Sequence, residues 1–348
     1  MRKIYLDYAS LTPIDKRVKK IMKKYEKKEY GNPSALYASG VAAKKVLQES
    51  REKVAKIINA HPDEIIFTSG GTESNEIALR TTGTGHIVIS EIEHSSIIKN
   101  TKATQIRVDK SGIVDLEELK KAITPETAFV SVMMVNNETG TIEPIREIAK
   151  IVRDAGKSFN SNILFHTDAS QAMYLPLHVE KLGVDLMTLD GNKIYGPRGV
   201  GMLYVKRGTA EIHRSGTENL PGIAGIACAL EIAEKTREKE YARISELKNF
   251  FAEELKKKNV EIKVNGSIKN SSPHILSVSI PNIDNEFFVL QLDAKGIECS
   301  TKSACLKDED ESYVLKAMGA DSRISVRFSF GRHTTKRELK KVIKTLTM

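Results

Sequence analysis

The chain has 348 residues, of which 40% are hydrophobic and 28% are charged, and its formal net charge at pH 7 is +9. This composition excludes a disordered chain, and the length predicts a large domain plus a smaller one. The apolar runs are too short for a membrane span, and Asp7 stands where a signal peptide needs its apolar core. We therefore expect a cytoplasmic protein that makes no membrane contact.

Positive and negative charges are interspersed along the chain, as in Glu231–Lys258. This mixture favours a solvated basic surface over a nucleic-acid site, and a docking surface for an acidic protein is the alternative. The three cysteines, Cys228, Cys299 and Cys305, form no Cys-x-x-Cys pair. We expect neither a disulfide framework nor a metal site, and we expect a reducing compartment.

Apolar runs that indicate strands alternate with amphipathic helical patterns over the first three quarters of the chain. The predicted strands are 65–68, 86–90, 129–135, 163–166, 184–189 and 201–205, and the predicted helices include 41–58, 116–122 and 145–152. Strands separated by helices predict an α/β fold with a mostly parallel sheet covered on both faces. Ligand sites in such sheets gather at the carboxyl ends of the strands.

A long helix is predicted over Glu231–Lys258, because apolar residues recur there at helical spacing. Two strand-like alternations follow it, and the second places Arg327 on a polar face. We expect a large domain over residues 14–243 and a small domain built from residues 1–13 and 244–348. The functional site should lie between them.

A glycine-rich segment, Phe67–Asn75, follows the first predicted strand and opens a helical pattern. Its Gly70 and Gly71 would let backbone N–H groups approach an anion at the helix N-terminus, and Thr72 would add a hydroxyl donor. A phosphate cradle is one interpretation, and a glycine turn with a Ser/Thr helix cap is the other. The segment is not the Gly-x-x-x-x-Gly-Lys pattern of nucleotide triphosphatases.

Polar residues stand at the ends of three further predicted strands. Asp168 ends an apolar strand, where a buried carboxylate needs a partner such as a protonated pyridine nitrogen, unless it simply caps a helix. His94 follows the strand at 86–90 and is either a site residue or a satisfied structural histidine. Asn137, after the run at 129–135, either forms a turn or binds a ring hydroxyl or carboxylate.

The most informative residue is Lys193, which follows the strand at 184–189 in a turn punctuated by glycine and proline. A lysine in a cleft loses solvation, and desolvation favours the neutral amine that can attack a carbonyl and form a Schiff base. The alternative is an ordinary loop lysine. The other motifs favour the catalytic interpretation.

Taken together, the motifs resemble one family over nearly the whole length of the chain. They are Tyr5–Ala9, Gly31–Ser34, Phe67–Asn75, Glu93-His94, Asn136–Glu138, Asp168–Gln171, Lys193–Pro197, Arg214–Thr217, Ser303–Cys305 and Val326–Ser329. The chain resembles a cysteine desulfurase of the NifS-like group, within the class V aminotransferases and the fold-type I pyridoxal-phosphate enzymes. The resemblance implies a mostly parallel central sheet sandwiched by helices, a smaller α+β domain, and pyridoxal 5'-phosphate as the cofactor.

The resemblance also implies how the cofactor is held. Lys193 would carry it as a Schiff base and later act as the acid–base group at the substrate's α-carbon, and Asp168 would pair with the pyridinium nitrogen. The resemblance further implies a catalytic His94 that stacks on the ring, and bonds to the phenolic oxygen from Asn137 and Gln171. It implies cofactor contacts from Gly71, Thr72 and Glu73, with Thr72 on the phosphate. A further phosphate contact would come from Thr217 of the second subunit of a homodimer.

For the substrate, L-cysteine, the resemblance implies that Arg327 binds the carboxylate with help from Asn32. Cys305, in a polar stretch typical of an exposed loop, would attack the substrate sulfur as a thiolate, leaving a persulfide on the enzyme and releasing alanine. We interpret Cys228 as an inert core residue. Cys299 is either structural or a second thiol able to receive sulfur.

The sulfur would pass to an acceptor or iron–sulfur scaffold protein, for iron–sulfur clusters, thio-cofactors or thiolated tRNA. One alternative keeps the cofactor but changes the chemistry, as in a selenocysteine lyase or another β-lyase. A second alternative is a degenerate homologue that acts as a sulfur-relay scaffold.

The chain departs from the family pattern beside the lysine. The family has Ser-x-His-Lys, and this chain has Asp190-Gly191-Asn192-Lys193. An ionised Asp190 cannot donate to a phosphate and would repel it at close range. Either it points away, or it is neutralised by a neighbour such as Arg214, or cofactor binding is weakened. The glycine-rich segment that precedes Arg214 in the family is also missing, which affects the phosphate contacts expected from the second subunit.

Overall fold

The structure is a computed structural model that describes residues 3–27, 30–209, 212, 214–258, 261–302 and 311–346. Its central sheet has seven strands in the order β2-β8-β7-β6-β5-β3-β4. They are β2 (Ile65–Thr68), β3 (His86–Ser90), β4 (Thr104–Ile106), β5 (Thr127–Ser131), β6 (Leu164–Asp168), β7 (Leu186–Asp190) and β8 (Gly201–Val205). Only β8 runs antiparallel to its neighbours. The predicted α/β fold with a mostly parallel sheet is confirmed.

The strand ends differ from the predicted ones in an informative way. β6 reaches Asp168 and β7 reaches Asp190, because these polar residues still pair with the neighbouring strand. The apolar run at 129–135 is strand only as far as Ser131. No apolar run predicts β4, since two of its three residues are exposed.

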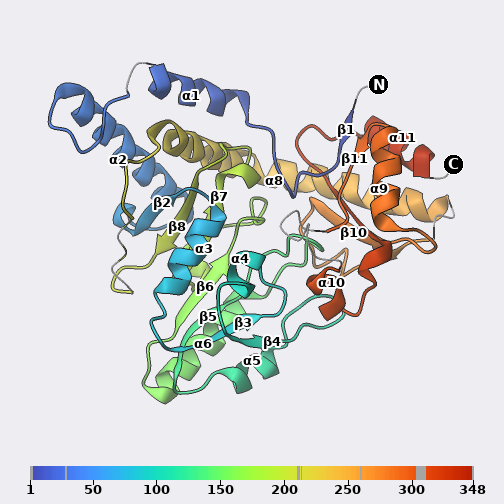
Figure 1. The fold of residues 1–348 in the computed structure, drawn as a ribbon, viewed down its shortest axis with the longest axis horizontal. Helices are drawn as coiled ribbons and strands as arrows, with labels where there is room; N and C mark the ends of the chain where they lie inside the picture. The colour runs from blue at the N-terminus through green and yellow to red at the C-terminus, as the bar shows by residue number, and fades with distance from the viewer. Residues whose placement is uncertain are drawn as a thin grey trace.

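Helices cover both faces of this sheet, as predicted (Figure 1). They are α1 (Lys16–Lys27), α2 (Ala38–Ile58), α3 (Gly71–Arg80), α4 (Ser95–Ile98), α5 (Leu116–Ala122), α6 (Ile145–Phe159), α7 (Val179–Leu182) and α8 (Leu220–Lys257). Successive strand residues point to opposite faces. The residues that pack with α3 and α4 are Phe129, Leu164 and Leu186, and their neighbours Val130, Phe165 and Met187 belong to the main core with α6 and α8.

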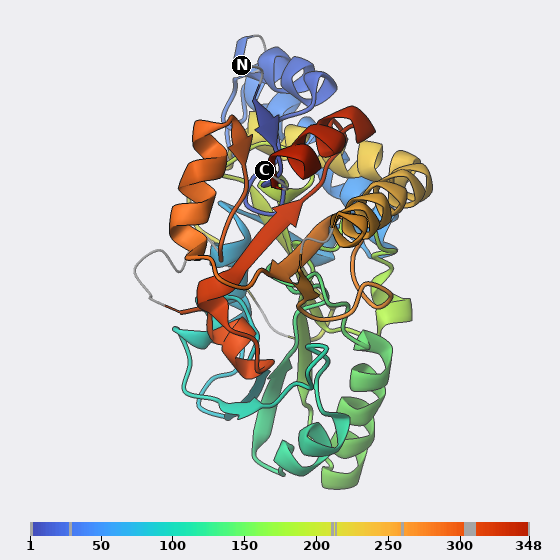
Figure 2. The same cartoon turned by 90° about the vertical axis from the view of Figure 1, so that its right-hand side faces the viewer.

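The N-terminus joins the residues after α8 in two small sheets. One pairs β1 (Ile4–Tyr5) in parallel with β11 (Ile297–Glu298), and the other is antiparallel in the order β12-β10-β9. The strands of the second sheet are β9 (Lys263–Val264), β10 (Ile275–Ser279) and β12 (Ser325–Ser329). The helices of this region are α9 (Asn285–Ala294), α10 (Tyr313–Ala317) and α11 (Lys336–Leu346). Figures 1 and 2 show α8 running from the helices beside the large sheet to this second group of elements.

The long helix begins earlier than predicted, at Leu220 and not at residue 231. Its first three turns are buried almost all round, so they lack the amphipathic pattern that marks its second half. The Asn219 side chain caps it by accepting from the Gly222 N–H at 3.1 Å, and a proline stands in its first turn. The expected domain boundary at residue 243 lies inside α8, and the domain division stays a prediction. None of the helices within the described ranges is long and apolar enough to cross a membrane.

Two glycines let the start of α3 approach the sheet. A Cβ on Gly201, the first residue of β8, would lie 2.6 Å from the backbone carbon of Gly70. A Cβ on Gly71 would instead meet side-chain atoms, the nearest being the Ser170 hydroxyl at 3.2 Å. Backbone atoms of a paired strand cannot move aside as a side chain can.

We therefore expect Gly201→Ala to destabilise the protein by about 1–3 kcal/mol, since the strand and the α3 loop must separate. Gly71→Ala should cost clearly less, because a hydroxyl and a carboxylate can adjust. Urea unfolding of both variants and the parent chain measures the difference. Equal stability of the two variants would contradict this account of the close approach.

Candidate active site

A cavity of about 220 Å³ lies at the carboxyl ends of the parallel strands and beside the N-terminal residues. Most of the site residues predicted from the sequence line it. The full lining is Ala9, Ser10, Gly71, Thr72, Asn75, His94, Met133, Val135, Asn137, Asp168, Ser170, Gln171, Asp190, Asn192, Lys193 and Arg327. Its position is the one that parallel α/β sheets use for ligands.

The N-terminal arm, residues 7–12, holds the lysine turn. Lys193 Nζ donates to the backbone oxygens of Ala9 (3.1 Å) and Ser10 (2.6 Å). Thr12 clamps the turn from both sides: its hydroxyl donates to the Asn192 oxygen at 2.7 Å and accepts from the Tyr195 N–H at 2.8 Å. The amine of Lys193 is thus aimed at the cavity by a segment far away in sequence.

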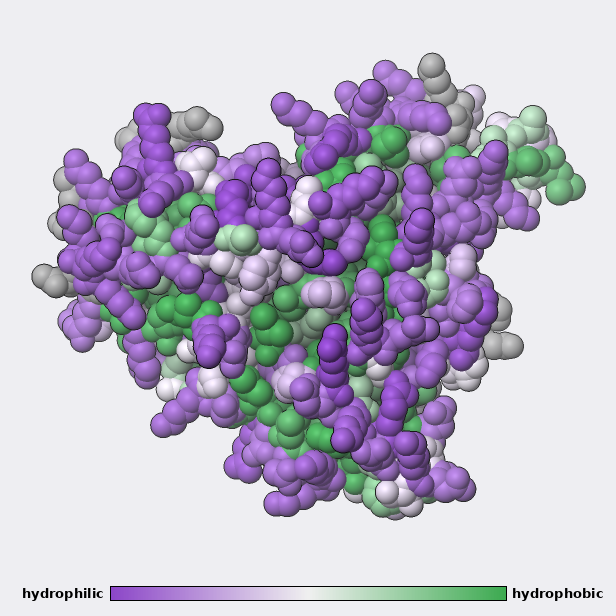
Figure 3. Space-filling model, turned by 180° about the vertical axis from the view of Figure 1, so that it is seen from behind, coloured by the Kyte–Doolittle hydropathy of each residue, from purple (hydrophilic) through white to green (hydrophobic). Residues whose placement is uncertain are grey.

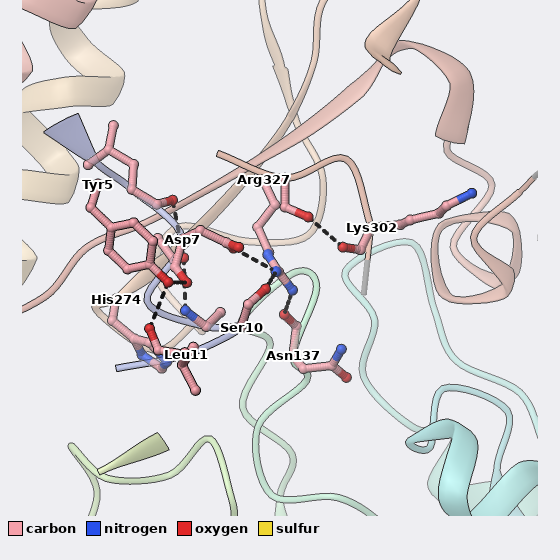
Figure 4. A network of polar contacts seen from close by, with 12 residues as sticks. Tyr5, Asp7, Ser10, Leu11, Asn137, His274, Lys302 and Arg327 are labelled. Carbon is pink, nitrogen blue, oxygen red and sulfur yellow. Dashed lines mark hydrogen bonds and ion pairs between the residues drawn. The ribbon is translucent and has the colours of Figure 1, made fainter. Parts of the chain in front are cut away.

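The same arm holds Arg327, which comes from β12 (Figure 4). Arg327 Nη2 donates to Asp7 Oδ1 at 2.9 Å and to Ser10 Oγ at 2.8 Å, and Nη1 donates to the Asn137 backbone oxygen at 2.7 Å. The side chain is only 3% exposed. Because the guanidinium is buried and is bonded to one carboxylate and two neutral oxygens, its plane is held in one orientation. Arg327 lies on the predicted polar face of its strand, but that face is buried.

Asp168 is linked to His94 through two side chains that sequence reasoning did not single out. Asn75 Nδ2 donates to Asp168 Oδ2 at 2.8 Å and to Ser96 Oγ at 2.9 Å. Ser96 Oγ lies 2.8 Å from His94 Nδ1, and the Ser96 backbone N–H donates to the same ring nitrogen at 3.2 Å. Since Nδ1 accepts, a neutral His94 carries its proton on Nε2. The chain of bonds fixes the carboxylate and the imidazole relative to each other.

A second relay orients Gln171. Its Nε2 donates to the Ala9 oxygen at 2.9 Å, and its Oε1 accepts from His274 Nε2 at 3.1 Å. His274 Nδ1 in turn accepts from the Ser272 hydroxyl at 2.6 Å. Burial, with the positive charges of Lys248, Arg327 and Lys193 adding to it, lowers the pKa of His274 to about 3, so this histidine is a neutral positioning residue.

His166 has a similar part beneath the cavity. It stands two residues before Asp168 on β6 and binds the hydroxyls of Ser131 (2.9 Å) and Thr188 (3.1 Å). Burial lowers the pKa of His166 to about 4 although Asp168 opposes the shift. The ring is therefore neutral at pH 7 and does not neutralise Asp168, which leaves that carboxylate to a cationic ligand.

The contacts of Asp190 beside the glycine-rich segment Phe67–Asn75 differ most from expectation. Asp190 neither points away nor pairs with Arg214: its Oδ2 accepts from the Gly71 N–H at 3.1 Å, and its Oδ1 accepts from the Asn192 N–H at 2.9 Å. Arg214 instead pairs with Glu73 at 3.2 Å. A carboxylate of the chain itself thus lies at the N-terminus of α3.

Unpaired polar atoms gather at this cavity. Among the described residues, seven buried side-chain polar atoms have no hydrogen-bond partner, and four of them belong to lining residues. These four are Asn75 Oδ1, Ser170 Oγ, Asn192 Oδ1 and Arg327 Nε. Because unpaired buried polar groups are costly and rare, their concentration marks a site shaped for a polar ligand.

The structure brings together eight of the predicted site residues: Gly71, Thr72, His94, Asn137, Asp168, Gln171, Lys193 and Arg327. Three others are not in the lining. Asn32 is exposed and caps its own turn by accepting from the Ser34 N–H at 2.9 Å, Thr217 is exposed, and Glu73 binds Arg214 and the Ser69 N–H. Their predicted roles within this cavity are not supported by a single copy of the chain.

Of the three cysteines, Cys305 lies outside the described residues. Cys299 is 9% exposed, and burial together with the nearby Asp7 charge raises the pKa of its thiol to about 12. Such a thiol is a poor nucleophile at neutral pH, which favours its structural interpretation. Cys228 is half-buried on α8, so it is less enclosed than the core position expected for it. The described residues contain no cluster that could hold a metal ion.

The lining residues missed from the sequence had weak signals. Asn75 stands four residues after Gly71, so a helical reading of the phosphate loop would place both on one face. A spacing of two residues separates Met133, Val135 and Asn137, so an extended segment would place all three on one face. Ser10 and Ser170 carry no pattern of their own.

Asn75 offers a direct test of the relay. Asn75→Ala should weaken binding of pyridoxal 5'-phosphate by roughly tenfold, or about 1–2 kcal/mol, because Asp168 loses one of its two donors. Asn100→Ala is a matched control, since Asn100 donates to the Ser96 backbone oxygen at 2.9 Å and does not line the cavity. Absorbance titration of each variant measures the affinity. A loss as large in Asn100→Ala would show that general destabilisation, and not the relay, is responsible.

Comparison with known proteins agrees with this geometry. The family model described as Aminotransferase class-V matches residues 4–214 and 208–342. The chain is 40% identical over 369 residues to the cysteine desulfurase IscS of Dictyoglomus turgidum, covering 97% of this chain and 92% of that protein. It is 36% identical over 372 residues to the cysteine desulfurase of Homo sapiens, covering 97% and 80%.

Solved structures give the same result. A NifS-like protein matches with a TM-score of 0.90 at 32% identity, covering 99% of this chain and 98% of that one. The NifS-like protein from Rickettsia africae matches with a TM-score of 0.87 at 30% identity, with the same coverage.

Pyridoxal 5'-phosphate is the cofactor of such enzymes. The residues present fit its ring, since one cavity holds an amine, a carboxylate bonded to the neutral donors Asn75 and Ser170, and four polar atoms that lack a partner in the described part of the chain. By sequence, fold and site, the chain belongs to the aminotransferase class-V family of fold-type I pyridoxal-phosphate enzymes.

Proposed function

We propose that this protein is a pyridoxal-phosphate-dependent cysteine desulfurase, which converts L-cysteine to L-alanine and retains the sulfur as a persulfide. The observation that carries the proposal is the convergence of Lys193, Asp168 and Arg327 on one cavity. The relatives named cysteine desulfurase, which match nearly the whole chain, support the choice of reaction.

Arg327 is suited to bind the substrate carboxylate. Its Nη atoms are already held by Asp7, Ser10 and Asn137, whereas Nε has no partner among the described residues. A planar guanidinium fixed in this way presents a rigid donor edge to an α-carboxylate. The substrate would therefore be oriented before any bond changes.

Lys193 and Asp168 are suited to the proton chemistry at the α-carbon. The cofactor, when bound, supplies an electron sink that stabilises negative charge at that carbon. Asp168 would keep the ring nitrogen protonated, and its bond from Asn75 holds the carboxylate in place. Lys193 Nζ, which donates to the backbone oxygens of Ala9 and Ser10, would move the proton.

Cys305 is the proposed nucleophile, although it lies outside the described residues. As thiolate it would attack the substrate sulfur, so that the carbon–sulfur bond breaks, a sulfur–sulfur bond forms and the carbon skeleton leaves as alanine after protonation. Its flanks support this role. On its N-terminal side, Ser300 pairs with Arg327. On its C-terminal side, Ser312 donates to Glu138 at 2.6 Å, and Tyr313 donates at 2.6 Å to the backbone oxygen of Glu93, the residue before His94.

A homodimer is part of the proposal. The segment between α1 and α2, together with the first turn of α2, exposes four large hydrophobic side chains, Tyr30, Leu36, Tyr37 and Val41. Figure 3 shows hydrophobic atoms at the tip of the lobe that this segment forms on the right. A second copy would cover such a patch, and it would account for Thr217, which is exposed here and is expected to reach the partner's site.

The proposal also includes a sulfur acceptor or iron–sulfur scaffold protein as the partner and the cytoplasm as the location. The free thiols of Cys228 and Cys299 accord with a reducing compartment.

The lysine assignment predicts a visible result. Protein supplied with pyridoxal 5'-phosphate should absorb near the band of a lysine-bound pyridoxal phosphate, and Lys193→Ala should lose that band and at least about a hundredfold of the alanine production. Lys206→Met is a control, because Lys206 pairs with Asp185 at 3.3 Å and lies outside the cavity lining. A parent chain that stays colourless with added cofactor would favour a sulfur-relay scaffold instead.

The thiol assignment needs its own experiment. Cys305→Ser should keep the cofactor band but form no persulfide when L-cysteine is added, because serine cannot accept sulfur in this way. Cys299→Ala should behave as the parent chain does, since its thiol is buried and its pKa is raised. Mass spectrometry of the intact protein detects the added sulfur. Persulfide at the parental rate in Cys305→Ser would overturn the assignment.

A further inference from the structure

The end of β7 places a negative charge of the chain itself in the phosphate cradle. Asp190 lines the cavity, and its Oδ2 accepts from the N–H of Gly71, the first residue of the ten-residue helix α3. Its other oxygen accepts from the Asn192 N–H and so stays fixed to the lysine turn. A backbone N–H at a helix N-terminus is the donor that an anionic phosphate uses.

A second residue shows that this place is built for a ligand. Ser170 is 9% exposed, and its hydroxyl has no hydrogen-bond partner among the described residues. A Cβ added to Gly71 would lie 3.2 Å from that hydroxyl and 3.3 Å from Asp190 Oδ2. The unpaired donor and the carboxylate therefore border the same small space beside the Gly71 N–H.

The cation expected to neutralise Asp190 has another partner. Arg214 pairs with Glu73, in the first turn of α3, at 3.2 Å. Lys193 Nζ donates to the Ala9 and Ser10 oxygens. A phosphate that reaches Gly71 must approach a carboxylate at close range or displace it, and like charges at that range repel.

We propose that Asp190 competes with the cofactor phosphate for the Gly71 N–H and keeps the affinity of this chain for the phosphorylated cofactor low. The cofactor would then be held chiefly through its ring and through Lys193, and it would exchange readily. Pyridoxal, which lacks the phosphate, would escape this competition. The inference rests on the proposed cofactor, but it concerns the phosphate end alone.

The test compares two aldehydes that differ only in the phosphate. The full chain, freed of cofactor, is titrated with pyridoxal 5'-phosphate and with pyridoxal, and absorbance reports the dissociation constants. Asp190→Asn removes the charge and keeps one acceptor oxygen, which can still accept from the Asn192 N–H, while its amide NH2 can donate to a phosphate. It should tighten binding of the phosphorylated aldehyde by roughly tenfold or more while changing pyridoxal binding less than about twofold. Ser170→Ala should weaken only the phosphorylated aldehyde.

Asp154→Asn serves as the charge control, because Asp154 is exposed on α6 and should leave both constants unchanged. An unchanged or weaker affinity for the phosphorylated aldehyde in Asp190→Asn would overturn the inference. So would an equal change for both aldehydes, which would make Asp190 a residue that only supports the lysine turn. Failure of every variant to bind either aldehyde would overturn the proposed function along with it.

Discussion

The site depends on one constraint: the N-terminal arm, residues 7–12, is bonded at once to the lysine turn and to the arginine strand. Backbone oxygens of the arm hold Lys193, and Asp7 and Ser10 hold Arg327. β1, which precedes the arm, is fixed by pairing with β11. Two groups that are 134 positions apart in the sequence are thereby set across one cavity, and preorganisation of this kind is what orients a small amino acid for reaction.

Charge is distributed unevenly around that cavity. At the ring end, neutral His166 and His274 surround Asp168 and Gln171, so the carboxylate is left for a cationic ring and the amide is held in one orientation. At the phosphate end the helix N-terminus is already bonded to Asp190. On our proposal, the ring end keeps the charges that the chemistry needs, and Asp190 changes only the charge beside the cofactor phosphate.

The sequence permitted prediction of the sheet and of the residues at strand ends, because strand-to-loop transitions in a parallel sheet converge on one edge. Lys193, Asp168 and His94 follow that rule. Asn75, Ser170 and His274 could not be predicted, since their roles depend on neighbours 21 to 103 residues away. Two placements of Asp190 were considered from the sequence, away from the cofactor or paired with Arg214, and the structure shows neither, because Asp190 accepts from the Gly71 N–H and Arg214 pairs with Glu73. The start of α8 was missed because a helix buried all round has no amphipathic period.

The central claim is that Lys193 is the amine that holds the cofactor. Borohydride reduction of the protein loaded with pyridoxal 5'-phosphate fixes the cofactor to the amine that carries it, and peptide mass spectrometry then identifies the residue. The account predicts the added mass on the peptide that contains Lys193. Added mass on Lys248 or another lysine instead, or no stable label in protein that binds the cofactor, would contradict it.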